Sequence, residues 1–373
     1  MSSYIEVEMV GDRSSFKNFI NLPWKIYKTD PHWVPPLKRD MKEVFNIQKY
    51  PFWRHAERQL YITWKNGEVV GRIAAIIDKN YNHFHNEKMG FFGFFESIHD
   101  YEVAAALFDA ANNWLRIKGM EIVRGPMNPS TNDECAFLLE GFNQDPVVMM
   151  PYNPKYYLDF AEQYGFYKSK DLYAYIKSQT DVPDRIRKFV DRVKKRENIV
   201  VRPINFKKFK EEVEKIKDVY NASWEKNWGF VPMTDDEMNY MAKKLKMIAD
   251  PELALIAEVD GNPIGIVVTI PDINPILKIV NGKFGPLQIL QFLYYRKKMR
   301  GTRSILFGLK PGYRRTGINT LLFYESVIAG AKLGYKWVEM SWNLEDNDLI
   351  NRFDQAVGGK LYKKYRIYEM KLN

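Results

Sequence analysis

Two dipeptides, Asn66-Gly67 and Asp260-Gly261, are the features that most constrain how this 373-residue chain can fold. Each joins two runs rich in strand-forming residues, 60-LYITWKNGEVVGRIAAIID-78 and 253-LALIAEVDGNPIGIVVTI-270. Asn-Gly and Asp-Gly favour the type I′ turn, which needs positive φ at both central positions. Each stretch therefore predicts a β-hairpin, one in each half of the chain.

The elements after each hairpin are repeated as well. A strand, a helix and a second strand are expected at 90–97, 102–119 and 120–127, and again at 304–309, 318–334 and 335–342. The helices carry apolar residues at three- and four-residue spacing, and Gly119 and Gly334 lie where left-handed C-terminal caps belong. A strand–helix–strand unit with short connections predicts parallel strands. Closing strands are expected at 165–177 and 359–372.

These patterns predict an α/β chain, of the α+β kind with mixed sheets, built from two tandem related domains. We place the domains at residues 1–177 and 199–373, with a basic helical connector at 178–198. The connector contains 185-RIRKFVDRVKKR-196, in which seven of twelve residues are Lys or Arg. A solvated basic face is the simpler interpretation of this segment. Nucleic-acid binding is the alternative.

Charge and composition narrow the functional classes. The formal net charge of +10 suits a polyanionic partner such as a nucleic acid, a phospholipid surface or a phosphorylated cofactor. The single cysteine, Cys135, excludes an intramolecular disulfide, and neither a signal peptide nor a membrane span is expected, so we expect a cytoplasmic protein. His83 and His85 alternate in 80-NYNHFHNEK-88, but a polar loop without a third ligand is the preferred interpretation, and no metal is expected.

The loop 310-KPGYRRTG-317 lies between an expected strand and an expected helix. The first N–H groups of a helix lack intrahelical partners, and the helix dipole is positive there. Gly312 and Gly317 let an anion approach the backbone, and Arg314 and Arg315 add positive charge. The loop therefore predicts an anion site. The first-half loop, residues 97–101, has neither glycine nor arginine and is followed by Glu102, so the first domain is not expected to bind the same anion.

The stretch 309-LKPGYRRTGINTLL-322 resembles the acyl-CoA-binding motif of the GNAT superfamily of acyl-CoA N-acyltransferases. In that motif, Arg/Gln-x-x-Gly-x-Gly/Ala wraps the diphosphate of coenzyme A; Arg314 and Gly317 match it, and Asn319 departs from it. The chain also resembles a group of bacterial GNAT-like proteins through 22-LPWKIYKTDPHWVPPL-37 and 362-YKKYRIYE-369. The resemblance implies two tandem GNAT-like domains, each a mostly antiparallel sheet with a parallel pair at its fourth and fifth strands. It implies acetyl-CoA or another acyl-CoA as co-substrate, bound through Phe307, Gly308, Leu309, Gly312, Arg314, Arg315, Thr316, Gly317, Ile318, Asn319, Thr320 and Asn343.

The resemblance also implies a mechanism, in which the amine of a small-molecule or peptide acceptor attacks the thioester directly in a ternary complex. A backbone N–H near 307–309 would stabilise the oxyanion, Gly308 would mark a bulge, and the strand at 335–342 would diverge to admit the pantetheine arm. The family's frequent tyrosine acid falls near Phe353 or Asp354, where this chain has no tyrosine. Candidate catalytic side chains are Glu339, Tyr362 and Tyr365.

Two other functions stay open from the sequence. One is a non-enzymatic acyl-CoA or ligand-binding protein, and the other is a transferase that uses aminoacyl-tRNA or another nucleic acid. Residues 273–302 interrupt the second half and include 286-PLQILQFLYYRKKMRG-301, an apolar helix with a basic end. Packing within the protein is the expected role of this helix, and a membrane surface or an acyl chain are the alternatives. Acceptor, acyl length and oligomeric state are not predicted.

Overall fold

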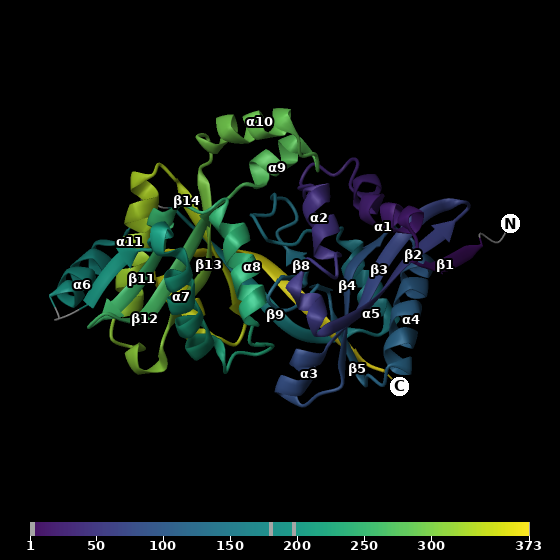
Figure 1. The fold of residues 1–373 in the computed structure, drawn as a ribbon, viewed down its shortest axis with the longest axis horizontal. Helices are drawn as coiled ribbons and strands as arrows, with labels where there is room; N and C mark the ends of the chain where they lie inside the picture. The colour runs from purple at the N-terminus through teal and green to yellow at the C-terminus, as the bar shows by residue number, and fades with distance from the viewer. Residues whose placement is uncertain (1–3, 179–181, 196–198, 373) are drawn as a thin grey trace. The chain divides into compact units, whose positions relative to one another are not determined.

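The computed structural model describes residues 4–178, 182–195 and 199–372, and it divides into two compact units (Figure 1). Unit 1 comprises Met1–Leu172, Leu277–Ile289 and Lys364–Asn373, and unit 2 comprises Tyr173–Ile276 and Leu290–Lys363. The domain limits expected from the sequence follow chain order and stay a prediction, whereas the units also take in segments from elsewhere in the chain. Residues 179–181 and 196–198 of the expected connector lie outside the described residues.

Unit 1 is built on a mixed sheet. Its strand order is β1-β2-β3-β4-β5, followed by the end of β15 and the start of β9. β1 to β4 pair antiparallel, β4 and β5 are parallel, and β5 and β15 are antiparallel. The strands are β1 (Ile5–Met9), β2 (Ala56–Lys65), β3 (Glu68–Asp78), β4 (Met89–Ser97), β5 (Ile122–Gly125), β6 (Met127–Asn128), β7 (Glu134–Cys135), β8 (Phe137–Glu140), β9 (Tyr167–Ser178) and β15 (Lys360–Lys371).

Helices cover both faces of this sheet, as the nearly continuous burial along β3 requires. Ile73, Ala75 and Ile77 pack in one core with α4 side chains, whereas Arg72, on the alternate face, donates to the Phe19 carbonyl of α1. The helices of unit 1 are α1 (Arg13–Ile26), α2 (Lys38–Val44), α3 (Lys79–His85), α4 (Tyr101–Ile117) and α5 (Tyr156–Tyr164), with a 3-10 turn η1 (Pro51–Arg54).

Unit 2 repeats the plan. Its strand order is β9-β14-β13-β12-β11-β10, with β13 and β14 parallel and β10 to β13 antiparallel. Leu255 and Val267 pack with α11 side chains, whereas Ile256 and Ile266 pack with Val219 of α7, so helices again cover both faces. The strands are β10 (Ile199–Pro203), β11 (Ala254–Val259), β12 (Asn262–Pro271), β13 (Gly301–Leu309) and β14 (Trp337–Leu344). The helices are α6 (Asp184–Lys194), α7 (Phe209–Trp224), α8 (Asp235–Lys246), α11 (Ile318–Lys332) and α12 (Asp348–Ala356), with 3-10 turns η2 (Phe206–Lys208), η3 (Pro251–Leu253) and η4 (Pro311–Tyr313).

The structure confirms the fold class predicted from the sequence. Both hairpins form, and all four turn residues have positive φ, from 50° at Asp260 to 79° at Gly67. Both expected strand–helix–strand units contain parallel strands, and Gly119 and Gly334 have φ of 80° and 87°. The loop expected around His83 and His85 is wrong, because α3 continues directly from β3 with Asp78 as its N-cap.

Residues 274–296 form α9 (Asn274–Val280) and α10 (Pro286–Arg296), two successive helices between β12 and β13 (Figure 1). The unit boundary crosses this segment at 276/277 and at 289/290. Among the described residues, no helix combines the length and apolar character needed to span a bilayer.

Candidate active site

The parallel strands of unit 2 separate at their C-terminal ends. β13 and β14 pair from Gly301 opposite Trp337 to Ser304 opposite Met340. β13 nevertheless continues to Leu309 and β14 to Leu344. The strand divergence expected from the resemblance is therefore present. Its C-terminal edge is where open α/β sheets commonly bind ligands.

A cavity of about 310 Å³ occupies this divergence, and all of its lining residues belong to unit 2. One wall is apolar, and polar groups gather where α11 and α12 begin. The apolar wall includes Val267, Ile305, Phe323, Val327, Val338, Met340, Ile350 and Phe353. An apolar cavity with a few convergent polar groups is typical of a small-molecule site.

Seven of the residues predicted to bind the cofactor line this cavity. They come from β13, the following loop, the first turn of α11, and β14, and they are Phe307, Gly308, Leu309, Arg314, Arg315, Asn319 and Asn343. Of the other predicted residues, Ile318 is buried in the core with Leu309 and Leu322, and Thr320 is half-buried in α11. Gly312 is exposed in the turn. Their role in binding stays a prediction.

The loop between β13 and α11 has a defined shape. The Arg314 guanidinium donates to the Ser223 carbonyl at 2.9 Å, and the Thr316 hydroxyl donates to the Tyr313 carbonyl at 2.7 Å. Gly317 is the N-cap of α11 with φ of 91°, and it has no side chain to cap the helix. A Cβ at Gly317 would also lie 2.8 Å from the Phe189 ring of α6. This glycine is thus required both by the backbone conformation and by helix packing.

Two details of β13 differ from expectation. The bulge lies at Ile305 rather than at Gly308, since Val268 faces Leu306 while Thr269 faces Ser304. Gly308 has a different role, because a Cβ there would lie 2.4 Å from the Trp224 ring. The absence of a side chain at Gly308 therefore makes room for Trp224, which itself lines the cavity.

Glu339 and Tyr362, two of the candidate catalytic residues, belong to a buried polar cluster rather than to the cavity lining. Glu339 is fully buried, and it accepts hydrogen bonds from the Ser341 hydroxyl at 2.6 Å and from the Tyr362 hydroxyl. The Arg303 guanidinium lies 3.5 Å from the Glu339 carboxylate. The third candidate, Tyr365, is buried in unit 1. No observation assigns these three residues a chemical role, so that role stays a prediction.

Asp354 lines the cavity and was not among the candidate catalytic residues selected from the sequence. It lies on α12, is 3% exposed, and accepts a hydrogen bond of 2.7 Å from the Asn343 side-chain amide. Burial raises the pKa of the Asp354 carboxyl to about 7, although the Asn343 hydrogen bond acts in the opposite direction. The group therefore exchanges a proton near neutral pH, which is what a general base requires.

One signal in the sequence pointed to this residue. In 349-LINRFDQAV-357, Asp354 shares one helical face with Ile350 and Val357, at spacings of four and three residues. A carboxyl on the apolar face of an amphipathic helix is either partnered or functional.

The basic segment that suggested nucleic-acid binding is largely helical. Within α6, Val190 and Val193 are buried and pack against Leu321 of α11. Lys194 pairs with Glu325 at 2.5 Å. One face of the helix is therefore part of the unit 2 core.

Comparison with solved structures defines the class. A tandem GNAT protein from the clavulanic acid biosynthesis pathway has a TM-score of 0.59 at 12% identity, with 99% of each chain covered. A GCN5-related N-acetyltransferase from Sphaerobacter thermophilus has a TM-score of 0.54 at 11% identity, covering 99% of this chain and 96% of that one. The fold of this protein is the tandem GNAT fold. No protein-family model matches the sequence.

Two curated proteins are similar over nearly the whole chain. Protein YghO of Escherichia coli (strain K12) is 34% identical over 372 residues, covering 97% of this chain and 94% of YghO. The bacterial ceramide synthase of Caulobacter vibrioides (strain NA1000 / CB15N) is 33% identical over 377 residues, covering 99% and 98%. The chain belongs to the family of these two proteins.

Proposed function

We propose that this protein is an acyl-CoA-dependent N-acyltransferase whose reaction takes place in the cavity of unit 2. One observation carries the proposal: the cavity joins a cationic mouth, at Arg314 and Arg315, to a buried carboxyl group at Asp354. The mouth suits the diphosphate of coenzyme A. The carboxyl suits a reaction that must take a proton from an amine. A protein that only binds acyl-CoA needs no such group.

The binding half of the proposal rests on the start of α11. Gly317 leaves the first N–H groups of α11 without a side-chain cap, at the positive end of a helix of 15 residues. Arg314, Arg315 and Asn319 surround the same end of the cavity. The apolar wall then suits the pantetheine arm and the acyl chain.

The chemical half of the proposal uses Asp354. The amine nitrogen attacks the thioester carbonyl carbon, so a C–N bond forms and the C–S bond breaks. The Asp354 carboxylate takes the proton that the nitrogen loses, and it returns a proton to the departing coenzyme A thiolate. Backbone N–H groups of β13 beyond Ser304, where the pairing with β14 has ended, stabilise the oxyanion. In this scheme Asp354 has the role that sequence reasoning assigned to Glu339, Tyr362 and Tyr365.

For the substrates, we propose a long-chain amino alcohol as the acceptor and a long-chain acyl-CoA as the donor. The support is the relative named as a bacterial ceramide synthase, because a ceramide is the N-acyl amide of such an amino alcohol. The apolar lining of the cavity agrees with an extended acyl chain.

The direct test incubates purified protein with acetyl-CoA or palmitoyl-CoA and with either sphinganine or a short amine. We expect release of free thiol, and an amide product identified by its mass, with palmitoyl-CoA and sphinganine. Thiol release only with the short amine would contradict the proposed substrates. Retention on immobilised coenzyme A without thiol release from any pair would instead favour the non-enzymatic binding protein.

The Asp354→Asn variant tests the proton acceptor. It keeps the size of the side chain and a partner for Asn343, so we expect kcat to fall by about 10²–10⁴-fold with unchanged coenzyme A affinity. Wild-type activity should rise with pH through about 7 as Asp354 ionises, and this rise should be absent from the variant.

Asp348→Asn, an exposed carboxyl on the same helix, is the matched control and should retain full activity. Because both proteins use the same amine, the titration of the substrate contributes equally to both pH profiles. An Asp354→Asn enzyme with near wild-type kcat and an unchanged pH profile would exclude Asp354 as the base.

A further inference from the structure

Helix α10 and its basic flank form a surface that the proposed reaction does not use. We propose that this surface, made by Leu287, Ile289, Leu290, Leu293, Tyr294, Arg296, Lys297 and Lys298 and called here the α10 patch, binds the surface of an anionic phospholipid bilayer. In this proposal α10 lies in the interface, along the membrane surface rather than across the bilayer. The proposal goes beyond the proposed function and can be tested without any assay of acyl transfer.

Exposed large hydrophobic side chains are concentrated in the α10 patch and the residues just before it. Of eighteen large hydrophobic side chains exposed among the described residues, seven lie between Ile279 and Tyr294. Leu287 and Leu290 are 62% and 65% exposed, and α10 contains no buried residue. The packing role expected for this helix is therefore not what the structure shows.

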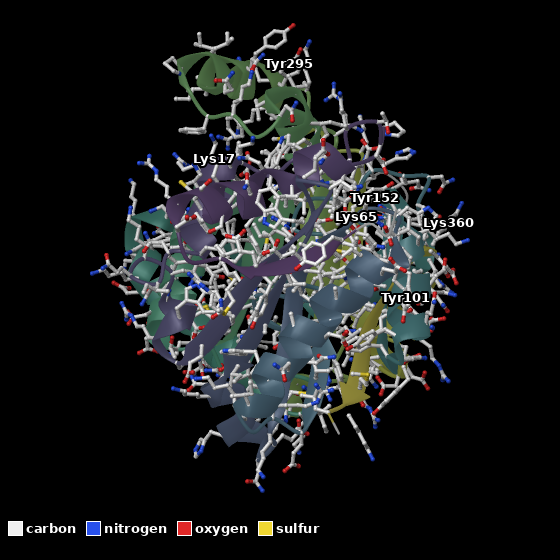
Figure 2. All side chains as sticks on the ribbon, turned by 90° about the vertical axis from the view of Figure 1, so that its right-hand side faces the viewer. Lys17, Lys65, Tyr101, Tyr152, Tyr295 and Lys360 are labelled. Atoms are coloured by element: carbon white, nitrogen blue, oxygen red, sulfur yellow. The ribbon has the colours of Figure 1, made fainter. Side chains whose placement is uncertain are left out.

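The exposed apolar residues share one side of the helix. Leu287, Leu290 and Tyr294 follow one another at spacings of three and four residues, and Leu293 lies beside them. The opposite side carries half-buried residues, including Gln288, Gln291 and Tyr295, of which Tyr295 marks this helix in Figure 2. An amphipathic helix whose apolar side faces outward is the typical element of interfacial membrane binding.

The positive charge of residues 273–300 favours an anionic membrane surface as the partner. Residues 273–300 contain six Lys or Arg and no Asp or Glu, and the next acidic residue along the chain is Glu325. Arg296, Lys297 and Lys298 are all exposed and follow the apolar stripe directly. Basic residues beside an apolar helix face are attracted to anionic lipid headgroups. Tyr294 adds an exposed aromatic ring, which is favoured at the headgroup level.

Contacts within unit 1 hold the turn before α10. The Trp24 indole donates to the Asn281 side chain at 2.9 Å, and the Lys38 backbone N–H donates to the Gly282 carbonyl at 3.0 Å. The Arg39 guanidinium stacks over the Phe284 ring at 4.0 Å. The turn that leads into α10 is therefore held by specific contacts, so the exposure of the apolar side of α10 does not result from an unpacked loop.

The test is co-sedimentation of the full-length protein with vesicles of phosphatidylcholine alone or of phosphatidylcholine mixed with phosphatidylglycerol. We expect binding to the mixed vesicles at least about tenfold tighter than to phosphatidylcholine. The variant Leu287→Gln/Leu290→Gln/Leu293→Gln should bind both kinds of vesicle about tenfold or more weakly than the wild type. In the variant Arg296→Gln/Lys297→Gln/Lys298→Gln, the affinity for the mixed vesicles should fall about fivefold per charge removed. Its affinity for phosphatidylcholine vesicles should not change.

The matched control is Ile117→Gln/Val200→Gln/Met247→Gln, which removes three comparably exposed apolar side chains outside the patch and should bind like wild type. Three outcomes would overturn the proposal. The first is that the wild type does not bind mixed vesicles. The second is that the control loses as much binding as the leucine variant. The third is that the leucine substitutions convert a dimer to a monomer while vesicle binding is unchanged. The last outcome would assign the patch to a second copy of the chain.

Discussion

Units 1 and 2 each contain a pair of parallel strands whose pairing stops before the first strand ends, but the space beyond the paired residues is filled differently. In unit 1, β4 pairs with β5 only from Met89 to Phe91 and continues to Ser97. Aromatic side chains of the unit 1 core pack beyond the paired residues, where the Tyr157 hydroxyl accepts a hydrogen bond of 2.8 Å from the Ser97 backbone N–H. In unit 2 the corresponding space is the cavity beside β13 and β14. A parallel strand pair whose pairing stops early thus does not by itself make a site, because the side chains beyond the paired residues determine whether a cavity remains.

The helix starts beside these strands differ in charge as well. In unit 1, the Asp100 carboxylate caps α4 by accepting from the Glu102 backbone N–H at 3.1 Å, and Lys65 pairs with the same carboxylate. In unit 2, Gly317 leaves α11 uncapped, with Arg314 nearby. A helix N-terminus that is already neutralised by a carboxylate has little affinity for a phosphate. We therefore expect unit 2 rather than unit 1 to bind an anionic ligand.

The largest expected effect comes from placing negative charge at the start of α11, as Asp100 does at the start of α4. Arg314→Glu/Asn319→Asp should weaken coenzyme A binding by about 100-fold or more, since like charges facing a diphosphate cost several kcal/mol. Affinity is measured by calorimetry. Gly317 is left intact, because any side chain there would press on Phe189.

The control for this variant is Arg13→Glu/Asn18→Asp, the same two substitutions on α1 of unit 1. It changes the net charge equally and should bind coenzyme A like wild type. Equal losses in both variants would mean that overall charge, rather than the start of α11, determines affinity.

The next test removes an aromatic side chain from the core of unit 1 and compares the loss of stability with that of a cavity residue in unit 2. Phe95 is buried and stacks on Phe108 with ring centroids 4.7 Å apart, so Phe95→Ala should destabilise the protein by about 3–5 kcal/mol. Phe353→Ala, at a half-buried position that already faces the cavity of unit 2, should cost less than about 2 kcal/mol. Urea unfolding measures both. Similar losses would show that the two spaces are packed alike.

The smallest expected effect concerns the cap of α4. Asp100→Ala should cost about 1 kcal/mol of stability, while Asp100→Asn, which can still accept the hydrogen bond, should cost less. Neither change should alter the stoichiometry of coenzyme A binding in calorimetry. A second binding site appearing in Asp100→Ala would show that this carboxylate alone excludes the ligand from unit 1.

Local turn chemistry explains why much of the fold was predictable. Asn66-Gly67 and Asp260-Gly261 place the hairpins, and Gly119 and Gly334 end the helices that cross to the parallel strands. The loop predicted to bind an anion could be selected because Gly312, Arg314, Arg315 and Gly317 lie close together in the sequence.

Other features depend on contacts between distant residues, which local patterns do not encode. The burial of Asp354 results from how α12 packs on the strands, so the sequence shows the carboxyl but not its environment. The cluster of Glu339 with Arg303 and Tyr362 joins residues of three strands, which a pattern read along one strand does not bring together. The bulge at Ile305 likewise follows from pairing with β12.

The last residues of the chain belong to unit 1, where Tyr368 to Lys371 of β15 pair antiparallel with Ile122 to Gly125 of β5. The ribosome makes β5 some 240 residues before this partner exists, as the numbering of the pair shows. During synthesis, the edge of β5 stays without this partner until β15 has been made, although domains generally fold as units beginning from the N-terminus. The first unit to be synthesised is therefore completed only after the strands of unit 2 have been made, and a truncation before Lys364 would leave that earlier-made half without the part of β15 that pairs with β5.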